Sequence, residues 1–117
     1  MRSLILFRDD KSAFDQSEIA SVARTINGAD SFSDDGSDFC TLKFHYRTHS
    51  DQTIARLSKD RKTVEIAGTG IASQRIAWAI QERVRQPLHV IDTDYSFDIE
   101  LWTCDCFEDF STTVEGI

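Results

Sequence analysis

The sequence predicts an α+β fold, with one antiparallel or mixed sheet of about five to six strands and two main helices packed on it. Three segments of strand-like alternation follow one another within residues 39–67, joined only by short polar turns, which favours antiparallel pairing. Apolar residues recur at helical spacing both before and after this run. With 117 residues, 40% of them apolar, we expect a single domain over residues 1–117.

The expected elements follow in order along the chain. They are a strand at 4–7, a helix at about 16–25, strands at 39–47, 52–57 and 63–67, a helix at about 72–85, strands at 88–91 and 95–102, and a short tail helix. Ser12 or Asp15 can supply the N-cap of the first helix, and Asn27-Gly28 tolerates the left-handed conformation that ends a helix. Residues 29–38 are rich in Ser and Asp, so we expect a polar loop there.

The middle elements are predicted from the alternation of polar and apolar residues and from the residues that end a helix. In residues 39–47, Leu42, Phe44 and Tyr46 share one face, while polar and basic side chains share the other. This pattern is typical of a strand with one face in water. The second helix has an apolar stripe on one side and ends before Pro87, the only proline of the chain.

The C-terminal elements are predicted from a second alternation. In residues 95–102, Tyr95, Phe97, Ile99 and Leu101 lie on one expected face, and polar residues together with Trp102 lie on the other. Phe107 and Phe110 are then spaced for one turn of a helix packed onto the core.

The distribution of charge is uneven along the chain. Residues 86–117 carry eight carboxylates and no Lys or Arg, whereas residues 43–85 carry nine basic and four acidic residues. The formal net charge is −7, which argues against sequence-independent binding of nucleic acid because phosphate contacts need a basic surface. An anionic face of this kind favours contact with a positively charged protein.

The residues expected to make that contact lie in the acidic C-terminal third. Asp98, Glu100 and Trp102 are the expected anchors, because they share the polar face of one predicted strand, and a Trp beside acids is typical of an interaction hot spot. The expected steering carboxylates are Asp92, Asp94, Asp105, Glu108 and Asp109. In an alternative interpretation, Trp102 packs under the tail, and the acids only keep an edge strand from aggregating.

A second functional hypothesis concerns a glycine motif. Gly68-x-Gly70-x-x-Ser73 follows a predicted strand and opens a helix, and the next strand ends at Asp92. This order is similar to a dinucleotide-binding fingerprint and suggests a regulatory domain that binds a nucleotide or another anionic small molecule. However, the third position is Ser, and only 25 residues follow Asp92, so a doubly wound sheet would be incomplete. The glycines more simply form the turn between strand and helix.

The sequence gives no basis for a catalytic centre, a metal or a cofactor. Cys104-x-Cys106 has no second cysteine pair with zinc-finger spacing, and the three histidines are scattered. Three cysteines without disulfide-framework spacing favour reduced thiols. There is no signal-peptide pattern and no apolar stretch long enough for a membrane span. We therefore expect a cytoplasmic protein without nucleic-acid or membrane partners.

Residues 63–101, TVEIAGTGIASQRIAWAIQERVRQPLHVIDTDYSFDIEL, resemble small bacterial proteins encoded beside polymorphic toxins, in particular immunity proteins of contact-dependent growth inhibition systems. The resemblance covers about a third of the chain and transfers no binding residue. It implies a cytosolic, non-enzymatic inhibitor that binds one cognate C-terminal toxin domain, commonly a nuclease. The basic cleft of a nuclease matches the acidic face that the charge distribution indicates.

Overall fold

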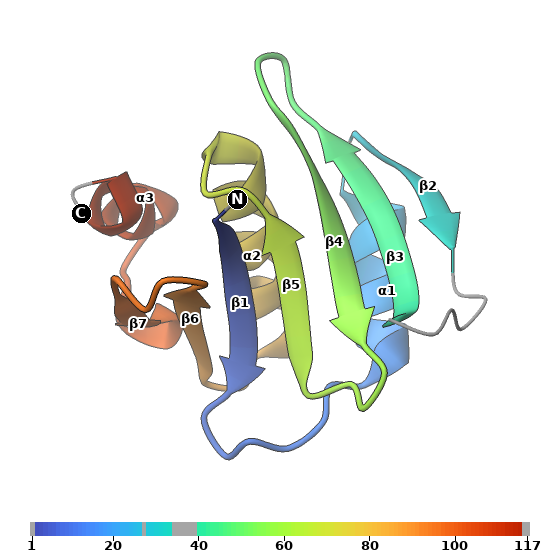
Figure 1. Cartoon of the computed structure of the whole chain (residues 1–117), viewed down its shortest axis with the longest axis horizontal. Helices are drawn as coiled ribbons and strands as arrows, with labels where there is room; N and C mark the ends of the chain where they lie inside the picture. Colours follow the sequence, from blue (N-terminus) through green and yellow to red (C-terminus); the bar gives the residue numbers. More distant parts are fainter. Residues whose placement is uncertain (1, 27, 34–39, 116–117) are drawn as a thin grey trace.

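A seven-stranded sheet forms one layer of the described chain, and helices lie against one of its faces (Figure 1). The structure is a computed structural model that describes residues 2–26, 28–33 and 40–115, with only the backbone described at 30–33, 40 and 41. Its elements are β1 (Ser3–Arg8), α1 (Gln16–Thr25), β2 (Ala29–Ser33), β3 (Cys40–Arg47), β4 (Gln52–Ser58), β5 (Thr63–Ala67), α2 (Ile71–Val84), β6 (Leu88–Asp92), β7 (Asp98–Glu100), the 3₁₀-helix η1 (Leu101–Thr103) and α3 (Phe107–Glu115).

The strand order is β2-β3-β4-β5-β1-β6-β7, and every pair of neighbouring strands is antiparallel. Because β5 and β6 both pair antiparallel with β1, they run parallel to each other with β1 between them. The β5-α2-β6 segment is therefore a split β-α-β unit. This arrangement confirms the predicted α+β class and its antiparallel sheet.

The predicted helices form close to their expected positions. Asp15 is the N-cap of α1, where its carboxylate accepts a hydrogen bond from the backbone N–H of Ser17 at 2.9 Å. Arg85 ends α2 in the left-handed conformation, two residues before Pro87. In α3, Phe107, Phe110 and Val114 are buried, as their helical spacing predicts.

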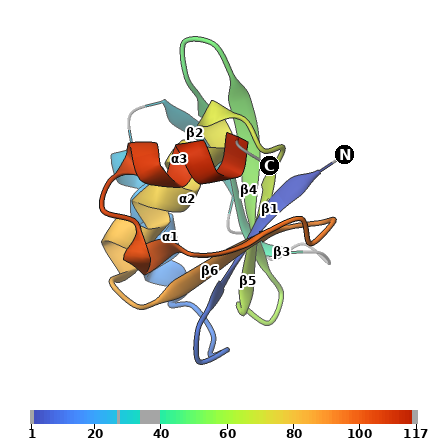
Figure 2. The ribbon, with the colours of Figure 1, turned by 90° about the vertical axis from the view of Figure 1, so that its left-hand side faces the viewer.

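The core lies between the sheet and the helices. Leu4, Leu6, Phe44, Leu57 and Val64 are buried on the inner face of the sheet and meet the buried stripes of α1 and α2. In the described part of the chain, no α-helix covers the opposite, outer face (Figure 2). This face carries every second residue of each strand, because successive side chains of a strand point to opposite sides.

Part of the predicted loop at residues 29–38 is instead an edge strand. The backbone of β2 pairs with β3, with Ala29 opposite Tyr46, while residues 34–38 lie outside the described residues, as do Asn27 and Phe39. Pairing uses backbone groups, so the polar composition did not prevent it. Gly28 leads into this strand with φ +106°, and a Cβ there would lie 2.4 Å from the carbonyl oxygen of Arg47. Only glycine permits this approach.

The predicted strand at residues 95–102 is mostly wrong. Only Asp98–Glu100 forms a strand, and Leu101–Thr103 is a turn of 3₁₀-helix. Tyr95 has φ +56° and is 78% exposed, so it does not share the buried face of Phe97. In the turn after β6, the carboxylate of Asp92 accepts the backbone N–H of Ser96 at 2.6 Å, so the next strand begins only at Asp98.

Candidate functional site

Two of the predicted anchors, Asp98 and Glu100, lie on the outer face of the edge strand β7. Asp98 pairs in register with Ile91 and Glu100 with His89, whereas Ile99 between them points into the core. The side chain of Asp98 is 57% exposed, and Glu100 is also exposed. The alternation within this short strand therefore places two carboxylates in solvent on the same side of the sheet.

A histidine beneath these carboxylates joins three elements. His89 Nδ1 lies 2.8 Å from Asp98 Oδ1, and His89 Nε2 lies 2.7 Å from Asp9 Oδ1. The imidazole stacks on Phe7 at a centroid distance of 5.1 Å. Burial lowers the pKa of His89. The hydrogen bonds and charges of Asp98 and Asp9 raise it by more than burial lowers it, so the net pKa lies above its usual value.

Trp102 lies beside the same histidine. Its ring meets the imidazole edge-on at 5.4 Å, and the residue remains 40% exposed. The indole therefore packs against His89 of β6, whereas the alternative interpretation placed it under the tail, and the rest of the ring is available to solvent. A rigid aromatic ring half-exposed among carboxylates is typical of contact surfaces.

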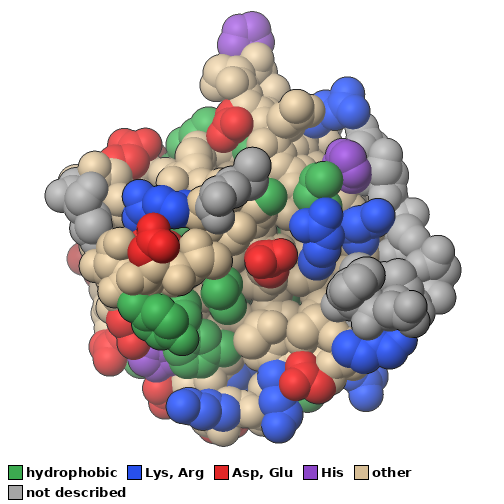
Figure 3. Space-filling model, viewed as in Figure 1, with side chains coloured by type: hydrophobic (Ala, Val, Ile, Leu, Met, Phe, Trp, Pro, Cys, Tyr) green, Lys and Arg blue, Asp and Glu red, His purple; other side chains and the backbone are tan. Residues whose placement is uncertain are grey.

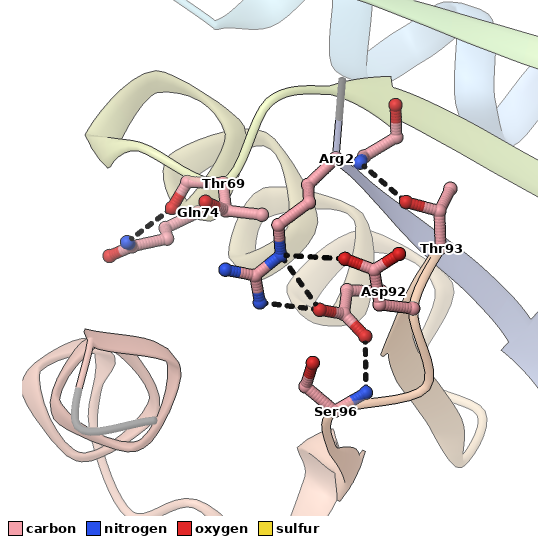
Figure 4. Close-up of polar contacts among 8 residues, drawn as sticks. Arg2, Thr69, Gln74, Asp92, Thr93 and Ser96 are labelled. Atoms are coloured by element: carbon pink, nitrogen blue, oxygen red, sulfur yellow. Dashed lines mark hydrogen bonds and ion pairs between the residues drawn. The ribbon is translucent and has the colours of Figure 1, made fainter.

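Asp92 does not belong to this surface. Its side chain is 0% exposed and forms an ion pair with Arg2, whose Nε also donates to Asp92 Oδ2 at 3.0 Å (Figure 4). Burial raises the pKa of Asp92, but the Arg2 guanidinium and the Ser96 N–H lower it more, so the net pKa is below its usual value. Asp94 is 65% exposed and lies 3.7 Å from Arg2 Nε. Arg2 therefore compensates two of the predicted carboxylates, and both Asp92 and Asp94 are left out of the candidate surface.

The remaining predicted carboxylates lie on and just before α3. Helix α3 packs against α2, where Phe107 and Phe110 meet Trp78 at centroid distances of 6.2 Å (Figure 2). Gln74, which is fully buried, accepts a hydrogen bond from Ser111 and donates one to the carbonyl of Thr69. These contacts fix one side of α3. The three predicted carboxylates of this segment, Asp105, Glu108 and Asp109, are exposed, as is Glu115 at the end of α3.

The structure therefore places the predicted residues in two groups at one side of the molecule. We name them together the acidic edge, which consists of Asp98, Glu100, Trp102, Asp105, Glu108 and Asp109. The first three lie at the β7 edge of the sheet, and the other three belong to α3 and the segment before it. Among the described residues, Glu100 and the three α3-segment carboxylates form no ion pair with Lys or Arg.

The opposite end of the outer face is basic, a feature that the sequence-based site did not include. Lys43 and Arg47 lie on β3, and Arg56 on β4 is directly opposite Lys43 in the strand register. Figure 3 shows Lys and Arg side chains gathered over β3 and β4, and hydrophobic side chains over β1 and β6. The alternation in residues 39–47 placed these basic side chains on a solvent face, but it could not show that the face stays uncovered.

The glycine turn before α2 is occupied by the protein itself. Asp51 Oδ2 accepts the backbone N–H of Ala72 at 3.1 Å, in the position that an anionic ligand would take at a helix N-terminus. A Cβ on Gly70 would lie 2.5 Å from the same oxygen, and the Ser73 hydroxyl donates to the carbonyl of Ala67 at 2.6 Å. These contacts favour a structural role for the turn over the nucleotide hypothesis.

The described residues offer little support for a metal site, a reactive cysteine or a membrane-spanning helix. Within residues 2–26, 28–33 and 40–115, no three His, Cys, Asp or Glu side chains gather in a way that could hold a metal ion. Burial raises the pKa of the half-buried Cys104 thiol, and the nearby Asp109 and Asp105 raise it further, which disfavours the nucleophilic thiolate. None of the described helices is long and apolar enough to cross a membrane.

Comparisons with protein-family models, with curated protein sequences and with solved structures found no match.

Proposed function

We propose that this protein is a non-enzymatic, immunity-type inhibitor that acts in the cytosol by binding a cognate toxin domain, a basic nuclease, through the acidic edge. The observation that carries the proposal is the group of exposed carboxylates around the half-exposed Trp102, which have no Lys or Arg partner within the part of the chain that the structure describes. A nuclease presents cationic side chains to phosphate. Carboxylates held on a folded surface can occupy such a cleft and exclude the substrate.

Each part of the acidic edge has a distinct task in this proposal. Glu108 and Asp109 on α3 provide long-range attraction and raise the association rate. Asp98 and Glu100 meet basic residues at close range, and Trp102 supplies apolar contact area. Because the α3 carboxylates lie at the periphery, their removal mainly slows association, whereas loss of Trp102 mainly speeds dissociation.

The test uses the toxin domain encoded beside the gene for this chain. Wild-type protein should inhibit the nuclease with one-to-one stoichiometry. Glu108→Lys/Asp109→Lys should lower the association rate by about tenfold at low salt, and Trp102→Ala should raise Kd by about thirtyfold. Glu18→Lys/Glu82→Lys is the matched control, because it makes the same charge change on α1 and α2.

Two results would contradict the proposal. One is that the toxin domain cleaves nucleic acid at the same rate with and without an excess of this protein. The other is that the α3 variant and the α1/α2 control associate equally fast at low salt, since attraction would then depend on net charge and not on the acidic edge.

A further inference from the structure

The outer face of the sheet has a charge pattern that runs across the strands. Following the register from β3 to β7 gives one row of side chains on this face: Lys43, Arg56, Glu65, Ile5, Ile91 and Asp98. The row begins with two cations and ends with a carboxylate. Arg47 adds a positive charge on β3, and Glu100 adds a negative charge on β7. One uncovered face therefore has a basic end and an acidic end.

Apolar side chains occupy the centre of the same face. A groove of about 670 Å³ is lined by four apolar or aromatic residues (Ile5, Phe7, Ile91 and Tyr95) and by five polar or charged ones (Lys11, Asp60, Lys62, Thr63 and Asp98). Ile54 is half-buried on β4. Tyr95, at the rim, is 78% exposed. An apolar centre between charged margins is the usual composition of a protein–protein interface.

At the basic end of this face, two cationic side chains of the isolated chain repel each other. Lys43 and Arg56 stand directly opposite each other, and like charges in such cross-strand pairs destabilise a sheet. Glu65 lies 3.9 Å from Arg56, whereas Lys43 is one strand farther from this carboxylate. An additional carboxylate placed over Lys43 would relieve this repulsion.

We propose that the outer face is a two-fold symmetric interface between two copies of this chain. A symmetric interface requires that each patch meets its complement at an equal distance across the axis. In the strand order, β3 and β7 lie two and a half strand positions to either side of the boundary between β5 and β1, which is about 12 Å. An axis along the strands at this boundary places Lys43 of each copy over Asp98 of the other. Because the axis keeps each side chain in its row, it also places Arg56 on β4 over Ile91 on β6, and Glu65 on β5 over Ile5 on β1.

The size and charge of the molecule are compatible with this interface. The two longest extents of the molecule, 37 and 35 Å, lie in the plane of the view of Figure 1, and a stable interface needs about 800 Å² from each partner. The net charge of −7 opposes association, but at 0.15 M salt charges more than about 8 Å apart are largely screened. The contacts within the interface then outweigh the distant repulsion.

The same face also limits what else can bind. Asp98 and Glu100 belong both to this interface and to the acidic edge, so a second copy and a cationic partner cannot use them together. The dimer itself does not depend on the proposed inhibitory function, because it is argued from the sheet face alone. The variant Lys43→Glu/Arg56→Glu separates the two: it should prevent the dimer and leave binding of the toxin domain intact.

Sedimentation velocity at 0.15 M salt tests the proposal. The mass of wild-type protein should rise from 13.3 kDa towards twice that value with increasing concentration. Lys43→Glu/Arg56→Glu and Asp98→Lys/Glu100→Lys should each weaken the dimer by at least tenfold, because each places like charges face to face. An equimolar mixture of these two variants should recover the wild-type affinity, because every contact across the axis is then again between opposite charges.

A wild-type protein that stays at 13.3 kDa up to millimolar concentration overturns the proposal. So does a dimer that forms in both charge variants, or a mixture that fails to associate although both variants are folded by circular dichroism. If a variant does not fold, methyl NMR of the wild type gives the answer. The signals of Ile5 and Ile54 should shift on dilution while that of the inward-facing Leu6 does not, and the reverse pattern contradicts the interface.

Discussion

Replacing Arg2 by Ala should cost more stability than neutralising its partner Asp92. The Asp92 side chain is 0% exposed, whereas the Arg2 side chain is 41% exposed. In Arg2→Ala the carboxylate remains buried and loses its cation, while it keeps its hydrogen bonds with Ser96. In Asp92→Asn the cation that loses its partner is already partly in water and still lies near Asp94.

The magnitudes follow from this difference in burial. Removing one partner of a buried ion pair costs about 3–5 kcal/mol, and the remaining hydrogen bonds with Ser96 place Arg2→Ala near the lower end, at about 3 kcal/mol. Asp92→Asn should cost about 2 kcal/mol, within the range of about 1.5–3 kcal/mol for a hydrogen bond to a charged group. The double variant should cost clearly less than the two together, because no buried charge is then left without a partner.

Urea unfolding of the four proteins at pH 7 and pH 5 measures these costs. In the wild type the pKa of Asp92 is lowered, so its contribution is present at neutral pH and is lost as the pH falls through the folded-state pKa. In Arg2→Ala the pKa of Asp92 should rise. The difference in free energy of unfolding between the wild type and this variant should therefore become smaller as the pH falls from 7 to 5. The reasoning is refuted if Arg2→Ala loses less free energy of unfolding than Asp92→Asn does. It is also refuted if the difference between Arg2→Ala and the wild type becomes larger on acidification.

Three further predictions concern single residues. His89→Gln should lower the free energy of unfolding most below pH 6.5, and the difference from the wild type should shrink as the pH rises through the raised pKa of His89; urea titrations at pH 5.5 and 8.5 check this, and an equal difference at both contradicts it. Gly28→Ala should cost at least about 2 kcal/mol, because the position has φ +106° and a Cβ would meet the carbonyl of Arg47; a thermal melt unchanged from the wild type would exclude the described turn. Asp51→Ala should cost about 1 kcal/mol through loss of the α2 cap, with Asp51→Asn as the milder control; an increase in melting temperature on adding NAD or ATP to the wild type would instead support a ligand at this turn.

Local patterns were sufficient to predict most of the elements. The limits of α1 follow from the Asp15 cap and the apolar period, and those of β5 from the alternation around Val64 and Ile66. Both signals lie within a few residues of the element that they specify, so the sequence carries them directly.

The two errors had causes outside their segments. Strand β2 forms because the edge of β3 offers backbone partners to a polar segment. The alternation that begins at Tyr95 resembles a strand, but the Asp92 carboxylate holds the N–H of Ser96 and the chain turns there. The contact that forms β2 is tertiary, whereas the Asp92–Ser96 hydrogen bond is a local turn that begins three residues before the predicted strand.

The candidate site was predictable in composition and less so in geometry. The excess of carboxylates after residue 86 is visible in the sequence, but Arg2 and Asp92 are 90 positions apart, and Asp9 and His89 are 80 apart. These pairs meet because β1 lies beside β6 in the sheet. Sequence spacing alone could not show that Asp92 is buried or that Trp102 packs against His89.

Hydrogen–deuterium exchange of the complex with the toxin domain encoded beside this gene most directly tests the acidic edge as the docking surface. We expect the toxin domain to slow amide exchange in residues 98–102 and 105–110, with no change in the exposed part of α1. Protection confined to α1, or to β3 and β4, with residues 98–110 exchanging as in the free protein, would contradict a docking role for the acidic edge.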